Sequence, residues 1–264
     1  MLKVKDIIAE LEQFAPPALA EPWDNVGLMV GDLEQRVTTV FVCLDVTSDN
    51  VRRATKWGAD LILSHHPLLF APPKHLVEQE VTGSIVRNLI RHEISVYSAH
   101  TNLDHATGGM NDVLAKHLSL TQVRRFRDEE CVDGAGNPID NIGRVGVLPV
   151  AMEMGDFAEL VRDALGCRSL RFVGTPEDTV KTVAVCSGSG GDGIYAAYHA
   201  GADVFVTSDI RHHEAQLAFE LGLNLIDAGH FETENTICRF MTEFLESRFP
   251  DLNVIPSDAK PYFQ

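Results

Sequence analysis

The feature that most constrains the fold is an internal repeat. Shifting the chain by 143 positions aligns "VTTVFVCLDVTSDNVRRATKWGADLILSHH" (37–66) with "VKTVAVCSGSGGDGIYAAYHAGADVFVTSD" (180–209) without a gap. Ten of these 30 positions are identical, and they include Cys43 with Cys186 and the Gly-Ala-Asp triplets that begin at Gly58 and Gly201. A repeat of this length predicts two copies of one strand–helix–strand unit.

The pattern around the repeat extends this prediction. Apolar residues recur with helical spacing in 4–14, 48–58 and 82–93, where Ser48 is the expected cap of the second helix. β-branched and apolar runs predict strands in 38–46, 59–64 and 94–99. Such alternation predicts an α/β fold with largely parallel strands, built from two similar, duplicated α/β units. The polar, glycine-containing segment 127–144 is the expected connector between them.

Composition excludes several classes of protein. A chain of 264 residues with 45% hydrophobic and 23% charged residues is typical of a soluble globular protein, and it contains no apolar run that approaches a membrane span. The net charge of -16 disfavours a nucleic-acid partner. Five scattered cysteines without a Cys-x-x-Cys pair predict neither a disulfide framework nor a thiolate zinc site. We therefore expect a cytoplasmic protein.

Histidines and carboxylates follow the predicted strands. His65 and His66 end the strand in 59–64, and aligning 94–104 with 224–234 places His100 over His230. Each of these last two segments then reads His-x-x-x-carboxylate. Because parallel strands present their carboxyl ends to ligand crevices, these side chains are expected to converge. Imidazole and carboxylate are common ligands of Zn, Mn and Fe. Adjacent residues of an extended chain point to opposite sides, so the two neighbouring histidines are expected to serve two ions.

Taken together and in this order, five motifs resemble one known family. They are "WDNVGLMVGD" at Trp23, "LSHHPLLF" at Leu63, "SAHTNLD" at Ser98, "TSDIRHHEA" at Thr207 and "DAGHFETE" at Asp227. The chain is similar, over nearly its whole length, to the dinuclear-metal, hexamer-forming GTP cyclohydrolase 1 type 2 homologues.

The resemblance implies a site, an assembly and an activity. The implied ligands of two divalent metal ions (Zn, Mn or Fe) are His65, His66, Asp104, His230 and Glu234. The implied fold has two similar α/β units with an exchanged C-terminal part: 1–125 plus 228–264 carrying the metal site, and 126–227 inserted. The implied assembly is a ring-shaped homohexamer. The implied activity is hydrolytic ring opening of GTP to formate and dihydroneopterin triphosphate. Two alternatives stay open: a metal-dependent phosphoester or amide hydrolase, or a non-catalytic metal-binding or protein-interaction ring.

Further residues have competing interpretations. His100 either orients Asp104, carries protons or is structural, and a role in orienting a ligand is favoured. Asp209 and His213 either contact a ligand or substrate, or cap the following helix. Gly188, Gly190 and Gly193 spell G-x-G-x-x-G, a dinucleotide-binding pattern. The next predicted strand begins too soon after them for a βαβ unit of about 30 residues. We therefore interpret these glycines as a tight turn.

Overall fold

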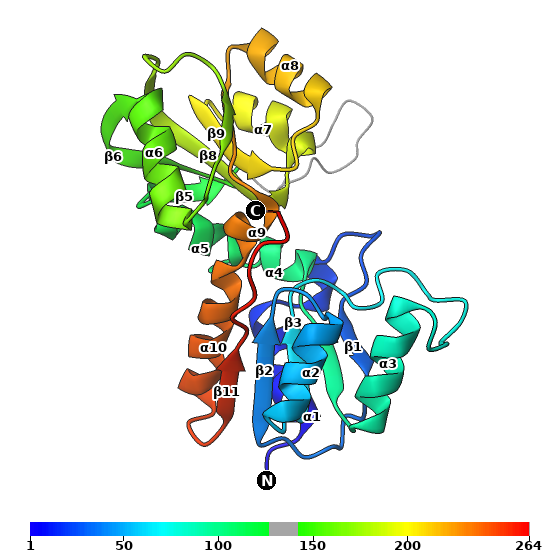
Figure 1. Ribbon diagram of the computed structural model, residues 1–264. Helices are drawn as coiled ribbons and strands as arrows, with labels where there is room; N and C mark the ends of the chain where they lie inside the picture. Colours follow the sequence, from blue (N-terminus) through cyan, green and yellow to red (C-terminus); the bar gives the residue numbers. More distant parts are fainter. Residues whose placement is uncertain (127–141, 264) are drawn as a thin grey trace. The chain divides into compact units, whose positions relative to one another are not determined.

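The computed structural model describes residues 1–126 and 142–263, and the chain forms two compact units (Figure 1). The first comprises Met1–Ala106 and Ile237–Lys260, and the second comprises Thr107–Thr236 with the residues that follow Lys260. The second unit is therefore inserted into the first. Compared with the expected boundaries, it also takes in 107–125 and 228–236, because the helix at 230–234 packs on strands of the second sheet. Most of the expected connector, 127–141, lies outside the described residues.

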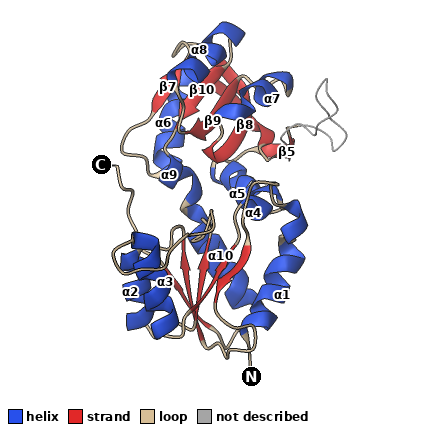
Figure 2. Ribbon diagram, turned by 90° about the vertical axis from the view of Figure 1, so that its right-hand side faces the viewer, coloured by secondary structure: helices blue, strands red, loops and turns tan. Residues whose placement is uncertain are grey.

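The first unit is a five-stranded sheet with helices on both faces (Figure 2). Its strands run in the order β1-β4-β3-β2-β11, and all neighbours are parallel except β1 with β4. Its strands are β1 (Gly27–Val30), β2 (Thr39–Cys43), β3 (Leu61–Ser64), β4 (Ser95–Ser98) and β11 (Asn253–Pro256). Its helices are α1 (Val4–Phe14), α2 (Ser48–Lys56), α3 (Val81–Arg91), α4 (Thr101–His105) and α10 (Thr236–Arg248), whose first residue is assigned to the second unit.

The three central strands β2, β3 and β4 are buried along their whole length, which explains why they are mainly apolar rather than alternating. Phe41 and Ile62 belong to one core cluster with apolar residues of α2 and α3. On the opposite face lie α1 and α10, where Phe14 packs against Phe244 with ring centroids 5.0 Å apart. Helix α2 begins one residue earlier than a Ser48 cap would give, because Thr47, not Ser48, caps it and accepts the Asn50 N–H.

The second unit is a six-stranded sheet in the order β5-β6-β8-β9-β10-β7. Its strands are β5 (Thr121–Arg125), β6 (Arg144–Glu153), β7 (Arg171–Val173), β8 (Thr179–Ser189), β9 (Val204–Ser208) and β10 (Asn224–Asp227). Its helices are α5 (Met110–His117), α6 (Met154–Leu165), α7 (Ile194–His199), α8 (His212–Leu221) and α9 (His230–Glu234). Helices α5 and α6 contribute to one core cluster and α7 and α8 to another, so this sheet is also covered on both faces.

The expectation of largely parallel strands is wrong for the second sheet. Only β8–β9 and β9–β10 are parallel, whereas β5–β6, β6–β8 and β10–β7 are antiparallel. The reason is that the chain adds antiparallel strands on both sides of the parallel trio, and these strands lie outside the repeated segment. The protein is therefore a mixed α/β protein with two mixed sheets.

The repeated segments form corresponding ladders in the two units. In the first, Val40 pairs with Leu61, and in the second, Val183 pairs with Val204, which are the same positions plus 143. The triplet aspartates also make the same contacts. Asp60 accepts the N–H groups of residues 38 and 39, and Asp203 accepts those of residues 181 and 182.

The alignment of the next strand is wrong by one residue. Leu61 pairs with Ser95 and Val204 pairs with Asn224, so the offset between β4 and β10 is 129, not 130. Helices α4 and α9 start at residues 101 and 230, which gives the same offset of 129. His100 therefore corresponds to Gly229 rather than to His230.

None of the helices in the described part of the chain combines the length and the apolar character that crossing a membrane would require.

Candidate metal centre

His65 and His66 lie just past the end of β3, and the backbone around them is fixed by hydrogen bonds. Their N–H groups donate to the carbonyls of Cys43 and Leu44, which continues the pairing of β3 with β2. The Ser64 hydroxyl donates to the His66 carbonyl at 2.9 Å. The two rings lie with centroids 5.2 Å apart. Strict alternation does not hold beyond the strand end, so these neighbouring rings lie close together rather than on opposite sides.

Three histidines of the first unit gather at this strand end. His65, His66 and His100 each offer a ring nitrogen, and these nitrogens all lie within 4.8 Å of one another. His65 is almost fully buried, and the other two are partly buried. His100 comes from the end of the neighbouring strand β4, where it precedes α4. The carboxyl ends of two adjacent parallel strands thus bring the three rings together, as expected for this fold class.

Each of these rings is oriented through its Nδ1 atom. Nδ1 of His65 lies 2.9 Å from the Ala99 carbonyl, and Nδ1 of His66 lies 2.7 Å from a carboxylate oxygen of Asp45. Nδ1 of His100 lies 2.9 Å from Asp24. A carbonyl or carboxylate oxygen accepts a proton here, so each Nδ1 carries the hydrogen, and Nε2 of the neutral ring keeps its lone pair. This is the tautomer that binds a metal through Nε2.

Asp24 and Asp45 were not predicted from the sequence. Asp24 lies in the motif that begins at Trp23, and Asp45 follows β2 directly. Asp24 also accepts the N–H and hydroxyl of Thr101. Burial would raise the pKa of Asp24, but the hydrogen bonds from His100 and Thr101 outweigh it and hold the pKa far below its usual range. The Asp24 carboxylate is therefore charged at neutral pH.

Asp104 lies on α4, with one carboxylate oxygen 3.6 Å from Nε2 of His65. The helix is held in place by Asn102, whose buried side chain donates to the Ala15 carbonyl at 2.7 Å, and by Leu103 in the core. Because Asp104 and His65 are both buried, their donor atoms face each other in an environment of low dielectric constant. A bound cation would compensate the carboxylate charge there.

The second unit holds its own histidine–carboxylate pair on α9. Nε2 of His230 lies 3.0 Å from Oε2 of Glu234, as the i,i+4 spacing on a helix predicts. Nδ1 of His230 lies 2.7 Å from Asp209, so this ring is oriented in the same way as those of the first unit. Asp209 adopts a positive φ of 56°, a conformation that aspartate tolerates better than most residues. Asp209 therefore positions His230 within the second unit.

The glycine-rich turn after β8 packs against this pair. Gly188 has a φ of +63°, and a Cβ added to it would lie 2.2 Å from a carboxylate oxygen of Glu234. Its N–H donates to the Thr233 hydroxyl at 3.0 Å. The glycine is required because its backbone approaches Glu234 this closely. The following helix α7 is only six residues long, and Asp209 is engaged with His230. This geometry favours the tight turn over a dinucleotide-binding loop.

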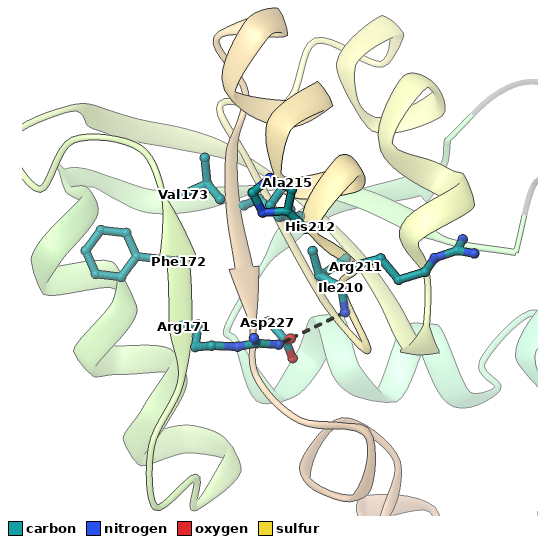
Figure 3. A pocket seen from close by; sticks show the side chains of 9 residues that line it. Arg171, Phe172, Val173, Ile210, Arg211, His212, Ala215 and Asp227 are labelled. Carbon is teal, nitrogen blue, oxygen red and sulfur yellow. Dashed lines mark hydrogen bonds and ion pairs between the residues drawn. The ribbon is translucent and has the colours of Figure 1, made fainter.

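A separate pocket of about 240 Å³ lies at the carboxyl ends of β9 and β10 in the second unit (Figure 3). Its walls are mainly apolar and include Phe172 and Ile210. The Arg171 guanidinium donates to Asp227, which also accepts the Ile210 N–H at 3.4 Å.

The predicted candidate His213 is exposed on the first turn of α8, where its charge contributes to lowering the pKa of Glu214 after the larger effect of Arg211.

The donor atoms fit a divalent transition metal. Each unit by itself offers both donor types: imidazole nitrogens with the Asp104 carboxylate in the first, and the His230 imidazole with the Glu234 carboxylate in the second. This mixture of nitrogen and oxygen ligands is typical of zinc, manganese and iron sites. The carboxylates and the carbonyl behind the rings are the partners that metal-binding histidines usually have.

Known proteins match the chain over its whole length. Residues 2–261 match the Duf34/NIF3 (NGG1p interacting factor 3) family. A "GTP cyclohydrolase 1 type 2 homolog" of Clostridium perfringens is 37% identical to this chain, and the alignment covers 100% of this chain and 99% of that protein. Another protein of that name, from Methanocaldococcus jannaschii, is 34% identical, and the alignment covers 97% of this chain and 100% of that protein. The crystal structure of a Bacillus cereus protein related to NIF3 has a TM-score of 0.89 at 26% identity, covering 100% of this chain and 99% of that one.

Proposed function

The chain belongs to the Duf34/NIF3 family, and from this premise we propose that it is a hydrolase that depends on two divalent metal ions. The observation that carries the proposal is the orientation of the histidines. Nδ1 of His65, His66 and His100 is engaged by an oxygen in each case, and the nitrogens offered by these rings lie within 4.8 Å of one another. Imidazoles that are oriented in this way by oxygen atoms are the usual construction of a catalytic metal site.

We assign the metal ligands to both units. His65, His66 and Asp104 come from the first, and His230 and Glu234 come from the second. The assignment is supported by the donor types and by the oxygen atoms that orient each ring. Bound divalent ions of this kind act as Lewis acids and activate water near neutral pH.

The other residues hold the ligands. Asp45 and Asp209 fix the ring orientation of His66 and His230, and the charged Asp24 does the same for His100. A histidine held in this way among the ligand residues is suited to orienting Asp104 or a substrate group. The hydrogen bonds of Asp24 leave the Nε2 side of His100 for that contact.

The proposed reaction is the hydrolytic opening of the five-membered ring of GTP, which consumes water and releases formate. It is supported by the names of the relatives, each of which is a homologue of GTP cyclohydrolase 1 type 2. The experiment is elemental analysis of protein purified without chelator, together with a formate assay on GTP after reconstitution with Zn, Mn or Fe. Two metals per chain with metal-dependent formate would support both parts of the proposal.

Variants make the test specific. His65→Ala and Glu234→Ala should lower the metal content and leave the fold intact, as circular dichroism would show. His75→Ala is the control, because this histidine is 66% exposed and pairs only with Glu80 among its described ion pairs. Full metal stoichiometry in both ligand variants would refute the site. Two bound metals per chain without formate release would refute GTP as the substrate and would favour another hydrolase activity or a binding role.

We also propose that the two units arose by duplication and that the chain assembles into a ring-shaped hexamer. The duplication is supported by the constant offset of 143 between the β2–β3 and β8–β9 ladders and by the matching contacts of Asp60 and Asp203. The hexamer is supported by family membership alone, and sedimentation velocity tests it. A monomer at micromolar concentration would refute it.

A further inference from the structure

Two large aromatic side chains are exposed side by side in the first unit. Trp23 is 58% exposed and Phe70 is 53% exposed, and their ring centroids lie 5.9 Å apart at an angle of 47°. Leaving so much aromatic surface in water is unfavourable, and a contiguous exposed apolar patch usually marks a binding site. We therefore expect this aromatic pair to bind a ligand.

The segments that carry these rings are held by hydrogen bonds. Asp24, next to Trp23, has a side chain that is 0% exposed and accepts hydrogen bonds from His100 and Thr101. Asn25 donates from its side-chain amide to the carbonyl of Leu69, the neighbour of Phe70. This bond ties the two segments together. The aromatic pair is thus preorganised, which reduces the entropy that a ligand would lose by ordering it.

The pair lies beside the histidine cluster. The Trp23 ring meets the His100 ring edge-on, with centroids 6.2 Å apart at 72°. The His100 nitrogen lies within 4.8 Å of those of His65 and His66. A planar ring of a nucleobase's size stacked on Trp23 would therefore reach the side chains to which we assign metal binding.

We propose that Trp23 and Phe70 form a stacking platform for the planar heteroaromatic ring of the substrate. Aromatic side chains bind such rings through their faces. Stacking needs no positive charge, which suits a chain with a net charge of -16. The proposal deepens the function proposed above and rests on it, since it assigns the residues that would recognise the ring part of that substrate.

The two tryptophans of the chain allow a direct test. Trp57 is 61% exposed at the end of α2, and Trp57→Phe leaves Trp23 as the single tryptophan, which excitation at the red edge of its absorption reports selectively. Guanosine monophosphate and ribose 5-phosphate differ only in the base. We expect saturable quenching of Trp23 emission by the first and none by the second. In this background, Phe70→Ala should weaken binding of guanosine monophosphate about tenfold, which corresponds to about 1.4 kcal/mol. Phe219→Ala, at a residue that is 70% exposed on α8, should not change it.

The outcomes separate this proposal from the one on which it rests. If guanosine monophosphate quenches Trp23 emission but the protein releases no formate from GTP, the stacking platform is supported and the proposed reaction is refuted. If Trp23→Ala releases formate from GTP with an unchanged KM, the stacking platform is refuted and the proposed hydrolase activity is supported. Equal quenching by both probes, or equal affinity in Phe70→Ala, would also overturn it. A changed sedimentation coefficient in Phe70→Ala with unchanged binding would identify the pair as a subunit contact instead.

Discussion

Asp24 should contribute strongly to the stability of the first unit. Its carboxylate accepts four hydrogen bonds, two on one oxygen from Nδ1 of His100 and the Asn25 N–H and two on the other from the N–H and hydroxyl of Thr101, and its side chain is 0% exposed. Asp24→Asn replaces one oxygen by an amide that cannot accept. Either the bonds from His100 and Asn25 or the two bonds from Thr101 are then lost. A hydrogen bond to a charged group contributes about 1.5–3 kcal/mol, so the substitution should cost about 3 kcal/mol.

Thermal unfolding of metal-free protein, followed by circular dichroism, measures this loss. For a chain of this size, about 3 kcal/mol lowers Tm by about 6–12 °C. Asp163→Asn is the control, because that carboxylate is 74% exposed and should change Tm very little. A Tm for Asp24→Asn within about 2 °C of the wild type would contradict the argument.

The pH dependence gives an independent check. Because the folded-state pKa of Asp24 lies below its ordinary value of about 4, its stabilisation is present above that value and is lost as the pH falls through the folded pKa. The difference in unfolding free energy between wild type and Asp24→Asn should be constant from about pH 5 to 8 and should narrow in stronger acid. A difference that widens in acid would mean that Asp24 is not the charged acceptor described above.

Three further substitutions or reactions test other parts of the site. Asp45→Asn should weaken metal binding about 10–100-fold, because the imidazole that Asp45 orients loses its tautomer preference, and isothermal titration with Zn measures this. Gly188→Ala should destabilise more than Gly201→Ala in urea: both have positive φ, but only the first Cβ meets an atom, a carboxylate oxygen of Glu234 at 2.2 Å. Cys238 should resist a thiol reagent in the native protein, since burial first and Asp45 second raise its pKa to about 12, and labelling without denaturant would contradict this.

Local features of the fold could be read from the sequence. The helix expected at 4–14 begins and ends at those residues, because its apolar spacing fills one face of the sheet without competing signals. The strands expected in 38–46, 59–64 and 94–99 contain β2, β3 and β4. The antiparallel pairs of the second sheet could not be read, because an apolar run does not encode the direction of its neighbour.

The residues that orient the candidate histidines could not be predicted from the sequence either. Asp24 and His100 are 76 positions apart, and Asp45 and His66 are 21 apart. Histidines after a strand suggest metal binding by their type. Which nitrogen faces the site depends on oxygens that only the folded chain brings close, including the Ala99 carbonyl, which leaves no mark in the sequence.

The one-residue error in aligning the two units shows how chemical likeness can mislead. Matching His100 with His230 and Asp104 with Glu234 aligns residues of like chemistry. In the ladders, however, Ser95 and Asn224 pair with equivalent residues, so Ser95 corresponds to Asn224 and His100 corresponds to Gly229. A shift of one residue in a strand moves each side chain to the other face. The His-x-x-x-carboxylate segments are therefore not copies of one another: in the first unit the histidine precedes its helix, whereas in the second it is the first helical residue. If the two units descend from one ancestor, their candidate metal ligands arose separately, at different positions of a shared scaffold.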